Sequence, residues 1–254
     1  MTSPYLNLDK NNITHEHICC AIGKGKHQKG EQIKRDWLAQ EFEHGLIFRK
    51  LNERGKVFIE IMPCEYALKP IVAPNFMVIH CLWVSGKFKG HAHGKTLLNF
   101  AIDEAKKQNK DGICVLAGKA NYMTDGKFYE YFGFEKVDQT DNEIFELMSL
   151  AFRDDAKPPQ IAEPAKKAIL VGGRGITVFT TPQCPFVPTC LNDLKIVAAE
   201  MNLDVHVVNV KNHGEICDTP SPFGTYGVFL DEKFVTHEMR NEKGYRKIFS
   251  QFTT

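Results

Sequence analysis

Small, cationic and imidazole side chains crowd one turn of the chain, in "VSGKFKGHAHGKTLLNFAIDEA", residues 84–105, where an apolar strand gives way to an amphipathic helix. The unpaired amides of a helix start and the positive end of the helix dipole both favour a bound anion. Ala92 and Gly94 avoid the larger side chains that would block a diphosphate, and Lys89 and Lys95 add positive charge. The turn predicts a phosphate-binding loop, although its composition is also typical of a solvated loop.

Three polar side chains are candidates for proton transfer. Tyr129 lies on an expected short helix in "KFYEYFGFEKVD", with Tyr131 close by, and ordinary aromatic packing is the alternative. Glu60 interrupts the apolar "VFIEIMP", and His80 interrupts "FMVIHCLWV". A buried carboxylate has a raised pKa and accepts a proton near neutrality. The alternatives are a surface-facing strand glutamate and a hydrogen-bonded core histidine.

Further side chains are candidates for the neighbourhood of such a centre. Glu65 is a third candidate base, and Phe58, Tyr66 and Trp83 are candidates for the wall of an acceptor pocket, although core packing explains them as well. The alternating pair His91 and His93 has no nearby cysteine or carboxylate at metal-ligand spacing, so we expect no metal.

A second centre of chemistry is a thiol. Cys184, in "ITVFTTPQCPF", follows an expected strand and stands just ahead of a helix, where the dipole lowers a thiol pKa. The position three residues later is Val187, and Cys190 lies about 240° around a regular helix, which disfavours a dithiol reductase. Cys217 is a candidate to approach Cys184 in space.

The elements that must position these residues follow from periodicity and turn signals. In the first part we expect mixed α/β structure, with the long helix that follows the opening turn. The other expected helices are 17–23, 30–45 and 126–133, and the expected strands are 46–52, 56–63, 76–84, 112–118, 134–140 and 143–152.

The proline-rich stretch "RDDAKPPQIAEPAKKA", residues 153–168, predicts a linker between two domains, 1–152 and 169–254. The second domain reads as strand, helix, strand, hairpin and helix, which predicts a small sheet of about four strands containing a parallel pair. Its elements are expected at 175–181, 191–202, 204–210, 226–238 and 242–252, with the hairpin turning at Asp231 and Glu232.

The first domain resembles the GNAT superfamily of N-acetyltransferases. The run from Lys89 to Lys95 is similar to the family's pyrophosphate loop, Gln/Arg-x-x-Gly-x-Gly/Ala, with lysine and alanine at two of its positions, and "KFYEYFGFEKVD" is similar to the family's later signature. The resemblance implies a splayed mixed sheet, acetyl-CoA as co-substrate, amides from Leu82 to Val84 on the thioester carbonyl, and Tyr129 as general acid. The residues it implies for binding the co-substrate are Leu82, Trp83, Val84, Lys89, Gly90, His91, Ala92, His93, Gly94 and Lys95.

The second domain resembles the thioredoxin fold, with Cys184 at the position of the reactive cysteine and Pro220 or Pro222 where that fold carries a cis-proline. A GNAT domain followed by such a domain resembles the YoaP-type bacterial acetyltransferases. The resemblance implies acetyl transfer to the amine of a small molecule or peptide. A thiol redox or thiol-binding protein centred on Cys184, with Cys217 as a second thiol, and a non-catalytic acyl-CoA sensor are the alternatives.

Composition sets the remaining expectations. The 254 residues are 43% hydrophobic and 25% charged with net charge +1, so we expect no nucleic-acid or membrane partner. The eight cysteines include the adjacent pair Cys19 and Cys20 and follow no disulfide framework, and the sequence shows no export signal. We therefore expect reduced thiols in a cytoplasm, and a homodimer is compatible with the sequence.

Overall fold

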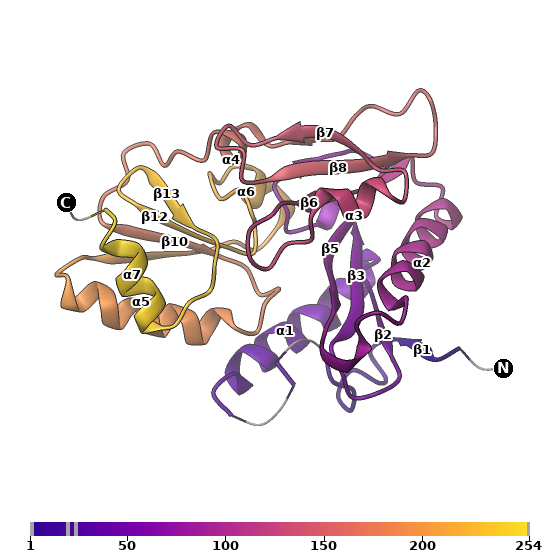
Figure 1. Cartoon of the computed structure of the whole chain (residues 1–254), viewed down its shortest axis with the longest axis horizontal. Coiled ribbons are helices and arrows are strands. Elements are labelled where there is room, and N and C mark those ends of the chain that lie inside the picture. The colour runs from indigo at the N-terminus through magenta and orange to yellow at the C-terminus, as the bar shows by residue number, and fades with distance from the viewer. Residues whose placement is uncertain (1–2, 19–20, 23–24, 253–254) are drawn as a thin grey trace.

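Two β-sheets organise the part of the chain that the computed structural model describes, residues 3–18, 21–22 and 25–252. The first has seven strands in the order β1-β2-β3-β5-β6-β8-β7, and the second has four in the order β11-β10-β12-β13. Figure 1 shows the first sheet with α2 on one side of the molecule and the second sheet with α5 and α7 on the other.

The first sheet is mixed, because β5 and β6 run parallel while its other neighbours are antiparallel. Its strands are β1 (Tyr5–Asn7), β2 (Ile47–Leu51), β3 (Val57–Pro63), β5 (Phe76–Val84), β6 (Gly112–Ala117), β7 (Glu135–Gln139) and β8 (Glu146–Ala151). The helices and 3₁₀ turns of this part are α1 (Gln28–Glu41), η1 (Phe42–His44), η2 (Cys64–Tyr66), η3 (Gly86–Phe88), α2 (His93–Lys107) and α3 (Gly126–Glu130).

Two helices cover the two faces of this sheet. The apolar stripe of α2, which includes Leu97, Leu98 and Ala101, packs on β3 and β5 and builds one core. On the opposite face, Trp37 and Leu38 of α1 pack against aromatic residues of β2 and β3. A ligand that enters between the strands has access to both faces of the sheet. It therefore meets side chains beneath α2 on one face and beneath α1 on the other.

The strands β5 and β6 separate after a short start. They pair only from Phe76↔Gly112 to Val78↔Cys114, whereas β5 continues to Val84 and β6 to Ala117. The expected splay is therefore confirmed. Beyond Val78, the edge of β5 that faces β6 has backbone groups available for a ligand.

A β-bulge in β5 changes which side chains face α1. Glu60 pairs with Cys81 and Ile61 pairs with Ile79, so His80 is an extra residue in β5. His80 and Cys81 consequently both contact the side of the sheet under α1, against the strict alternation of a strand. The bulge thus leaves His80 and Cys81 together on the same face as Glu60.

The second sheet combines a parallel pair, β10 and β11, with antiparallel β12 and β13. Its elements are β10 (Ile176–Thr180), α5 (Val187–Glu200), β11 (Val205–Asn209), α6 (His213–Cys217), β12 (Tyr226–Leu230), β13 (Lys233–Thr236) and α7 (Glu242–Phe249). The expected parallel pair, the four strands and the hairpin are confirmed, and Asp231 in its turn has φ 52°.

Residues 153–168 carry structure of their own. They form β9 (Gln160–Ile161), which pairs with β4 (Ile71–Val72), and α4 (Glu163–Lys167). Ile161 and Ala165 are buried in a core beneath the first sheet, and Lys166 contacts Asp138 at 2.6 Å. This connection is therefore held against the first sheet, and sequence periodicity did not indicate it because its elements are too short.

Some local expectations are wrong. Residues 17, 18, 21 and 22 are not helical, so the helix expected at 17–23 does not form there, while Cys19 and Cys20 lie outside the described residues. Helix α5 begins at Val187 rather than at residue 191, since Pro188 fits the first turn of a helix. No cis peptide bond occurs in the described part, so neither Pro220 nor Pro222 is a cis-proline.

In the ranges that the structure describes, no helix is both long and apolar enough to span a bilayer.

Candidate active site

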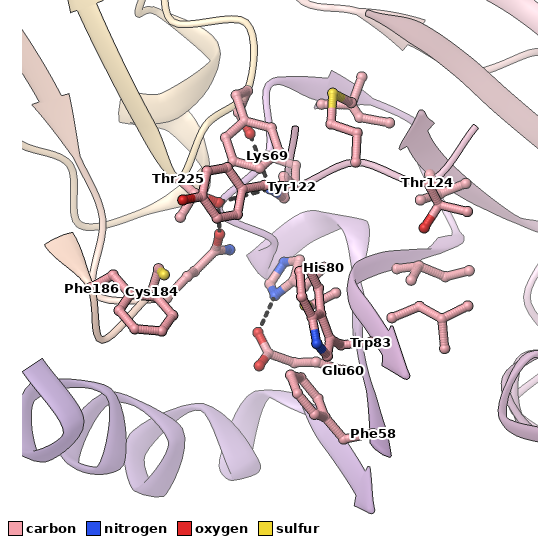
Figure 2. A pocket seen from close by; sticks show the side chains of 18 of the residues that line it. Phe58, Glu60, Lys69, His80, Trp83, Tyr122, Thr124, Cys184, Phe186 and Thr225 are labelled. Carbon is pink, nitrogen blue, oxygen red and sulfur yellow. Dashed lines mark hydrogen bonds and ion pairs between the residues drawn. The ribbon is translucent and has the colours of Figure 1, made fainter. Parts of the chain in front are cut away.

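A cavity of about 330 Å³ lies where the splayed strands meet the second domain. Side chains from β3, β5 and β6 line one part of it, and the loop before α5 and the region around β12 line the other. Figure 2 shows Glu60, His80 and Trp83 facing Cys184 and Phe186 across this space. The lining residues on which the site depends are Phe58, Glu60, Lys69, His80, Leu82, Trp83, Tyr122, Thr124, Tyr129, Gln183, Cys184, Phe186, Phe223 and Thr225.

The second domain closes this cavity through direct contacts with the first. Gly30 of α1 lies so close to Pro185 that an added Cβ would be 2.0 Å from its carbonyl oxygen, which only glycine permits. The Tyr122 hydroxyl donates to the Met239 carbonyl at 3.0 Å, and Gln183 Nε2 donates to the Leu68 carbonyl at 3.3 Å. The cavity therefore belongs to both domains.

A buried chain of polar contacts runs along the α1 face. Lys34 Nζ lies 2.6 Å from Glu60 Oε2, and His80 Nδ1 lies 3.3 Å from Glu60 Oε1. The Lys34 and Glu60 side chains are 3% and 1% exposed, so water does not compensate their charges. Because a carboxylate only accepts, the His80 proton on this side sits on Nδ1 and leaves Nε2 as an acceptor toward the cavity.

These contacts overturn the expected protonation of Glu60. Burial acts to raise the pKa of Glu60, but the Lys34 ammonium and the His80 hydrogen bond outweigh it and hold that pKa at about 2. Burial lowers the pKa of His80 below its ordinary value; Lys34 and Lys69 act in the same direction, against Glu60. Glu60 is therefore an ionised, fully engaged carboxylate, not a surface residue, and His80 is a neutral imidazole.

Tyr129 and Tyr131 differ sharply in position. Tyr129 is 2% exposed, lines the cavity and bonds to the Thr124 side chain, whereas Tyr131 is 78% exposed. Burial raises the pKa of Tyr129, so its hydroxyl keeps its proton at neutral pH. Of the two tyrosines, only Tyr129 faces the space beside the splayed strands.

The turn before α2 presents amides at the surface. Gly90 and Ala92 have φ 81° and 56°, so Ala92 occupies a left-handed conformation that glycine adopts more easily. Thr96 N–H donates to the Ala92 carbonyl as the first bond of the helix, which leaves the preceding amides, from His93 to Lys95, without a helical acceptor.

Packing does not explain the glycine in this turn. A Cβ added at Gly94 would meet Phe128 at 3.6 Å, an ordinary contact, so the fold itself tolerates a side chain there. The Lys89, His91 and Lys95 side chains are exposed, and His93 Nδ1 hydrogen bonds with the Tyr5 hydroxyl at 2.6 Å. An anion at this helix start fits both the free amides and the missing side chain.

The amides of Leu82, Trp83 and Val84, which are expected near a thioester, do not all face the same side of β5. The Ser85 N–H donates to the carbonyl of Lys56, the residue just before β3, at 3.1 Å. In a regular antiparallel strand alternate residues face the same neighbour, so the Trp83 amide also faces β3 and those of Leu82 and Val84 face the gap. Trp83 therefore does not contribute its amide to this gap, contrary to expectation.

The candidate thiols lie apart. Cys184 borders the cavity and packs with the cluster under α5, whereas Cys217 on α6 packs with a different cluster. Neither is disulfide-bonded, and Cys217 Sγ lies 3.6 Å from His213 Nε2, so the structure places the two thiols in different clusters rather than together. Burial raises the pKa of Cys217 to about 11, which disfavours a reactive thiolate there.

Two further candidates lie outside the cavity. Glu65 accepts a hydrogen bond from the Asn75 amide at 2.7 Å and lies 3.7 Å from Lys110, and Tyr66 is 48% exposed and stacks on His44. Neither serves the roles considered for it. In the described part of the chain, no group of three or more histidine, cysteine, aspartate or glutamate side chains is placed to hold a metal.

Sequence reasoning missed several residues of the site, above all the buried lysines. Lys34 lies on the same helical face as Gly30, Trp37 and Leu38, so a lysine at a core position of the pattern was the available signal. For Lys69, the only indication in the sequence was its position among apolar residues in "YALKPIV". Gln183, Phe223 and Thr225 carried no signal, because the contact between domains creates their role.

Comparison with known proteins agrees with this architecture. Residues 12–134 match the model of the acetyltransferase (GNAT) family, and residues 205–247 match a YoaP-like family model. A Bacillus subtilis (strain 168) protein described as uncharacterized N-acetyltransferase YoaP is 36% identical over 248 residues, which cover 97% of this chain and 98% of that protein. The chain therefore belongs to the GNAT family of acetyltransferases.

Solved structures are similar to about 60% of the chain at low TM-scores. A GNAT family acetyltransferase from Brucella melitensis in complex with acetyl-CoA is 16% identical, and the match covers 61% of this chain and 90% of the Brucella chain at a TM-score of 0.38. The ribosomal-protein-S18-alanine N-acetyltransferase from Escherichia coli is 14% identical, covering 61% and 98% at 0.38. Family membership rests on the sequence matches, not on these structures.

Proposed function

We propose that this chain transfers an acetyl group from acetyl-CoA to the amine of a small molecule or peptide by direct attack. The observation that carries the proposal is the gap between β5 and β6, which opens into the cavity that His80 and Tyr129 line. The diphosphate would be held by the amides at the start of α2, and the pantetheine would pair with the free edge of β5. The Leu82 and Val84 amides face the gap and would polarise the thioester carbonyl.

In this reaction the amine nitrogen forms a bond to the carbonyl carbon, and the carbon–sulfur bond breaks. His80 Nε2 is proposed to accept the proton that the amine loses, while Glu60 fixes the ring through Nδ1 and Lys34 keeps Glu60 ionised. The Tyr129 hydroxyl is proposed to give its proton to the departing sulfur, which becomes a thiol; Tyr129 then regains a proton from solvent, and His80 releases the proton that it accepted. Glu60 is thus a positioning residue here.

The second domain, residues 169–254, is proposed to be thioredoxin-like, with 1–152 as the acetyltransferase domain and 153–168 between them. In support, its elements follow the order β10, α5, β11, α6, β12, β13, α7, with β10 and β11 parallel and β12 beside β10. We propose that it forms one wall of the acceptor pocket. Neither the order of these elements nor the position of the domain beside the cavity favours redox chemistry at Cys184. A cytoplasmic location, a bacterial origin and a homodimer stay predictions of the sequence.

The test combines binding and turnover. Isothermal calorimetry measures CoA binding, and release of free thiol from acetyl-CoA is followed with a panel of amines. Gly94→Glu should abolish CoA binding because it places bulk and negative charge at the helix start, whereas Gly94→Ala, whose methyl group meets Phe128 at ordinary distance, is the matched control for folding. Undiminished CoA affinity in Gly94→Glu would refute the assignment of the loop.

A further inference from the structure

Lys69 is a buried cation at the junction of the domains. The residue is 3% exposed, and its Nζ donates to the Phe223 carbonyl at 3.0 Å and to Thr225 Oγ1 at 2.9 Å. The Phe223 ring centroid lies 4.3 Å from the same nitrogen. Among the described residues, no carboxylate oxygen lies within 4 Å of it. A buried ammonium without an anionic partner is unfavourable, so an anion at this position would be strongly attracted.

The cavity as a whole has an excess of positive charge. Lys34, Lys56 and Lys69 line it, and Glu60 is the one carboxylate among the described residues that do so. Glu60 is already engaged by Lys34 and His80. No carboxylate of the described lining forms an ion pair with Lys69, and burial lowers the pKa of Lys69 to about 8 although Cys81, Glu60 and Cys184 act in the opposite direction.

Two further polar atoms in the lining lack partners. His80 Nε2 and Trp83 Nε1 are buried and make no hydrogen bond to any described residue. The indole N–H can only donate, and the His80 Nε2 lone pair can accept from an amine. In Figure 2 the His80 ring lies between Glu60 and Lys69, so an acceptor for the amine proton and a cation face the same space. Buried polar groups without a protein partner are free to contact a polar ligand or water that enters the cavity.

The size and walls of the cavity limit that ligand. A volume of about 330 Å³ is at the small end of ligand pockets, which hold roughly 300 Å³ or more. Phe58, Trp83, Phe186 and Phe223 give it apolar walls. No arginine is among its described lining residues, and a single ammonium suits a monoanion better than a phosphate group, which usually meets several donors.

We propose that the acceptor is a small amine that also carries a carboxylate, such as a free amino acid with an apolar side chain, and that Lys69 binds this carboxylate. The inference rests on the proposed acetyl transfer and specifies its substrate. The amine would face His80, the apolar part would contact the aromatic walls, and Thr225 and Phe223 of the second domain would hold Lys69 in place. The second domain would thereby contribute to substrate selection.

The experiment compares matched pairs of amines with the full-length protein. Leucine, methionine and phenylalanine are each tested against the amine that lacks only the carboxylate, with thiol release from acetyl-CoA as the readout. We expect the carboxylate-bearing member to have the higher kcat/KM. Lys69→Met should lower the ratio of kcat/KM between acid and amine by about 30-fold, mainly through KM, as expected for losing one partner of a buried charge pair.

Two variants complete the design. Lys69→Arg keeps the charge and should retain a preference for the acid, whereas Lys107→Met, on the exposed end of α2, should leave the ratio unchanged. CoA calorimetry shows that each variant is folded. Equal or faster turnover of the decarboxylated amines, or an unchanged ratio in Lys69→Met, would overturn the inference while leaving acetyl transfer intact. Turnover of no amino acid by a protein that binds CoA would overturn it as well. If the wild-type protein neither binds CoA nor releases thiol with any amine, the proposed function itself would be refuted.

Discussion

The buried pair of Lys34 and Glu60 permits a quantitative prediction for Lys34→Met, which keeps the length of the side chain and removes its charge. The variant leaves the Glu60 carboxylate buried at 1% exposure, with the His80 hydrogen bond in place of the two contacts that it has in the wild type. Lowering the Glu60 pKa from 4.5 to about 2 corresponds to about 3 kcal/mol of stability at neutral pH. Breaking a buried ion pair typically costs about 3–5 kcal/mol, which agrees.

Urea unfolding followed by tryptophan fluorescence measures this effect, because both tryptophans, Trp37 and Trp83, lie near the pair. With a slope of about 2 kcal/mol per molar urea, the midpoint should fall by about 1.5 M. The pKa of Glu60 is depressed in the folded state, so its stabilisation is fully present above pH 4.5 and is lost as pH falls toward 2. The difference between wild type and variant should therefore shrink in acid.

Two controls make this prediction refutable. Lys107→Met removes an exposed lysine 3.6 Å from Glu104 and should change stability by less than about 0.5 kcal/mol. Adding Glu60→Gln to Lys34→Met removes the unpaired charge and should recover at least about 1 kcal/mol. A loss below about 1 kcal/mol in Lys34→Met, or no recovery in the double variant, would show that the pair does not hold Glu60 ionised.

Two further predictions concern the proton transfers. His80→Gln should lower kcat by about 100-fold or more. Because burial lowers the pKa of His80 from 6.5 and the base must be unprotonated, the wild-type kcat should fall only below pH 6.5. The variant should lack this fall in kcat at acidic pH. An acidic limb that persists in the variant would assign the base elsewhere. Tyr129→Phe should lower kcat by about 100-fold without weakening CoA binding, because the hydroxyl acts on the departing sulfur. The exposed Tyr131→Phe is its control, and equal effects of the two substitutions would argue against a role for Tyr129.

Local patterns in the sequence determined most of the secondary structure and the loop before α2. The strands at 56–63 and 76–84, the helix after the opening turn and the hairpin at Asp231 all follow from contacts between near neighbours, whose periodicity is visible in the chain. The glycine and alanine before α2 likewise act on their own backbone. These features therefore needed no knowledge of distant residues.

Only the tertiary structure decided the chemistry of the site. The protonation of Glu60 depends on Lys34, 26 residues away, and the surroundings of Lys69 depend on Thr225, 156 residues away. The bulge at His80 also puts Cys81 on the same face as His80, which strand alternation does not predict. A pKa is set by charges and burial in space, and neither can be read from spacing along the chain. The packing of α1 on the first sheet therefore decided the protonation of Glu60 and His80, and the contact between the two domains decided the lining of the cavity.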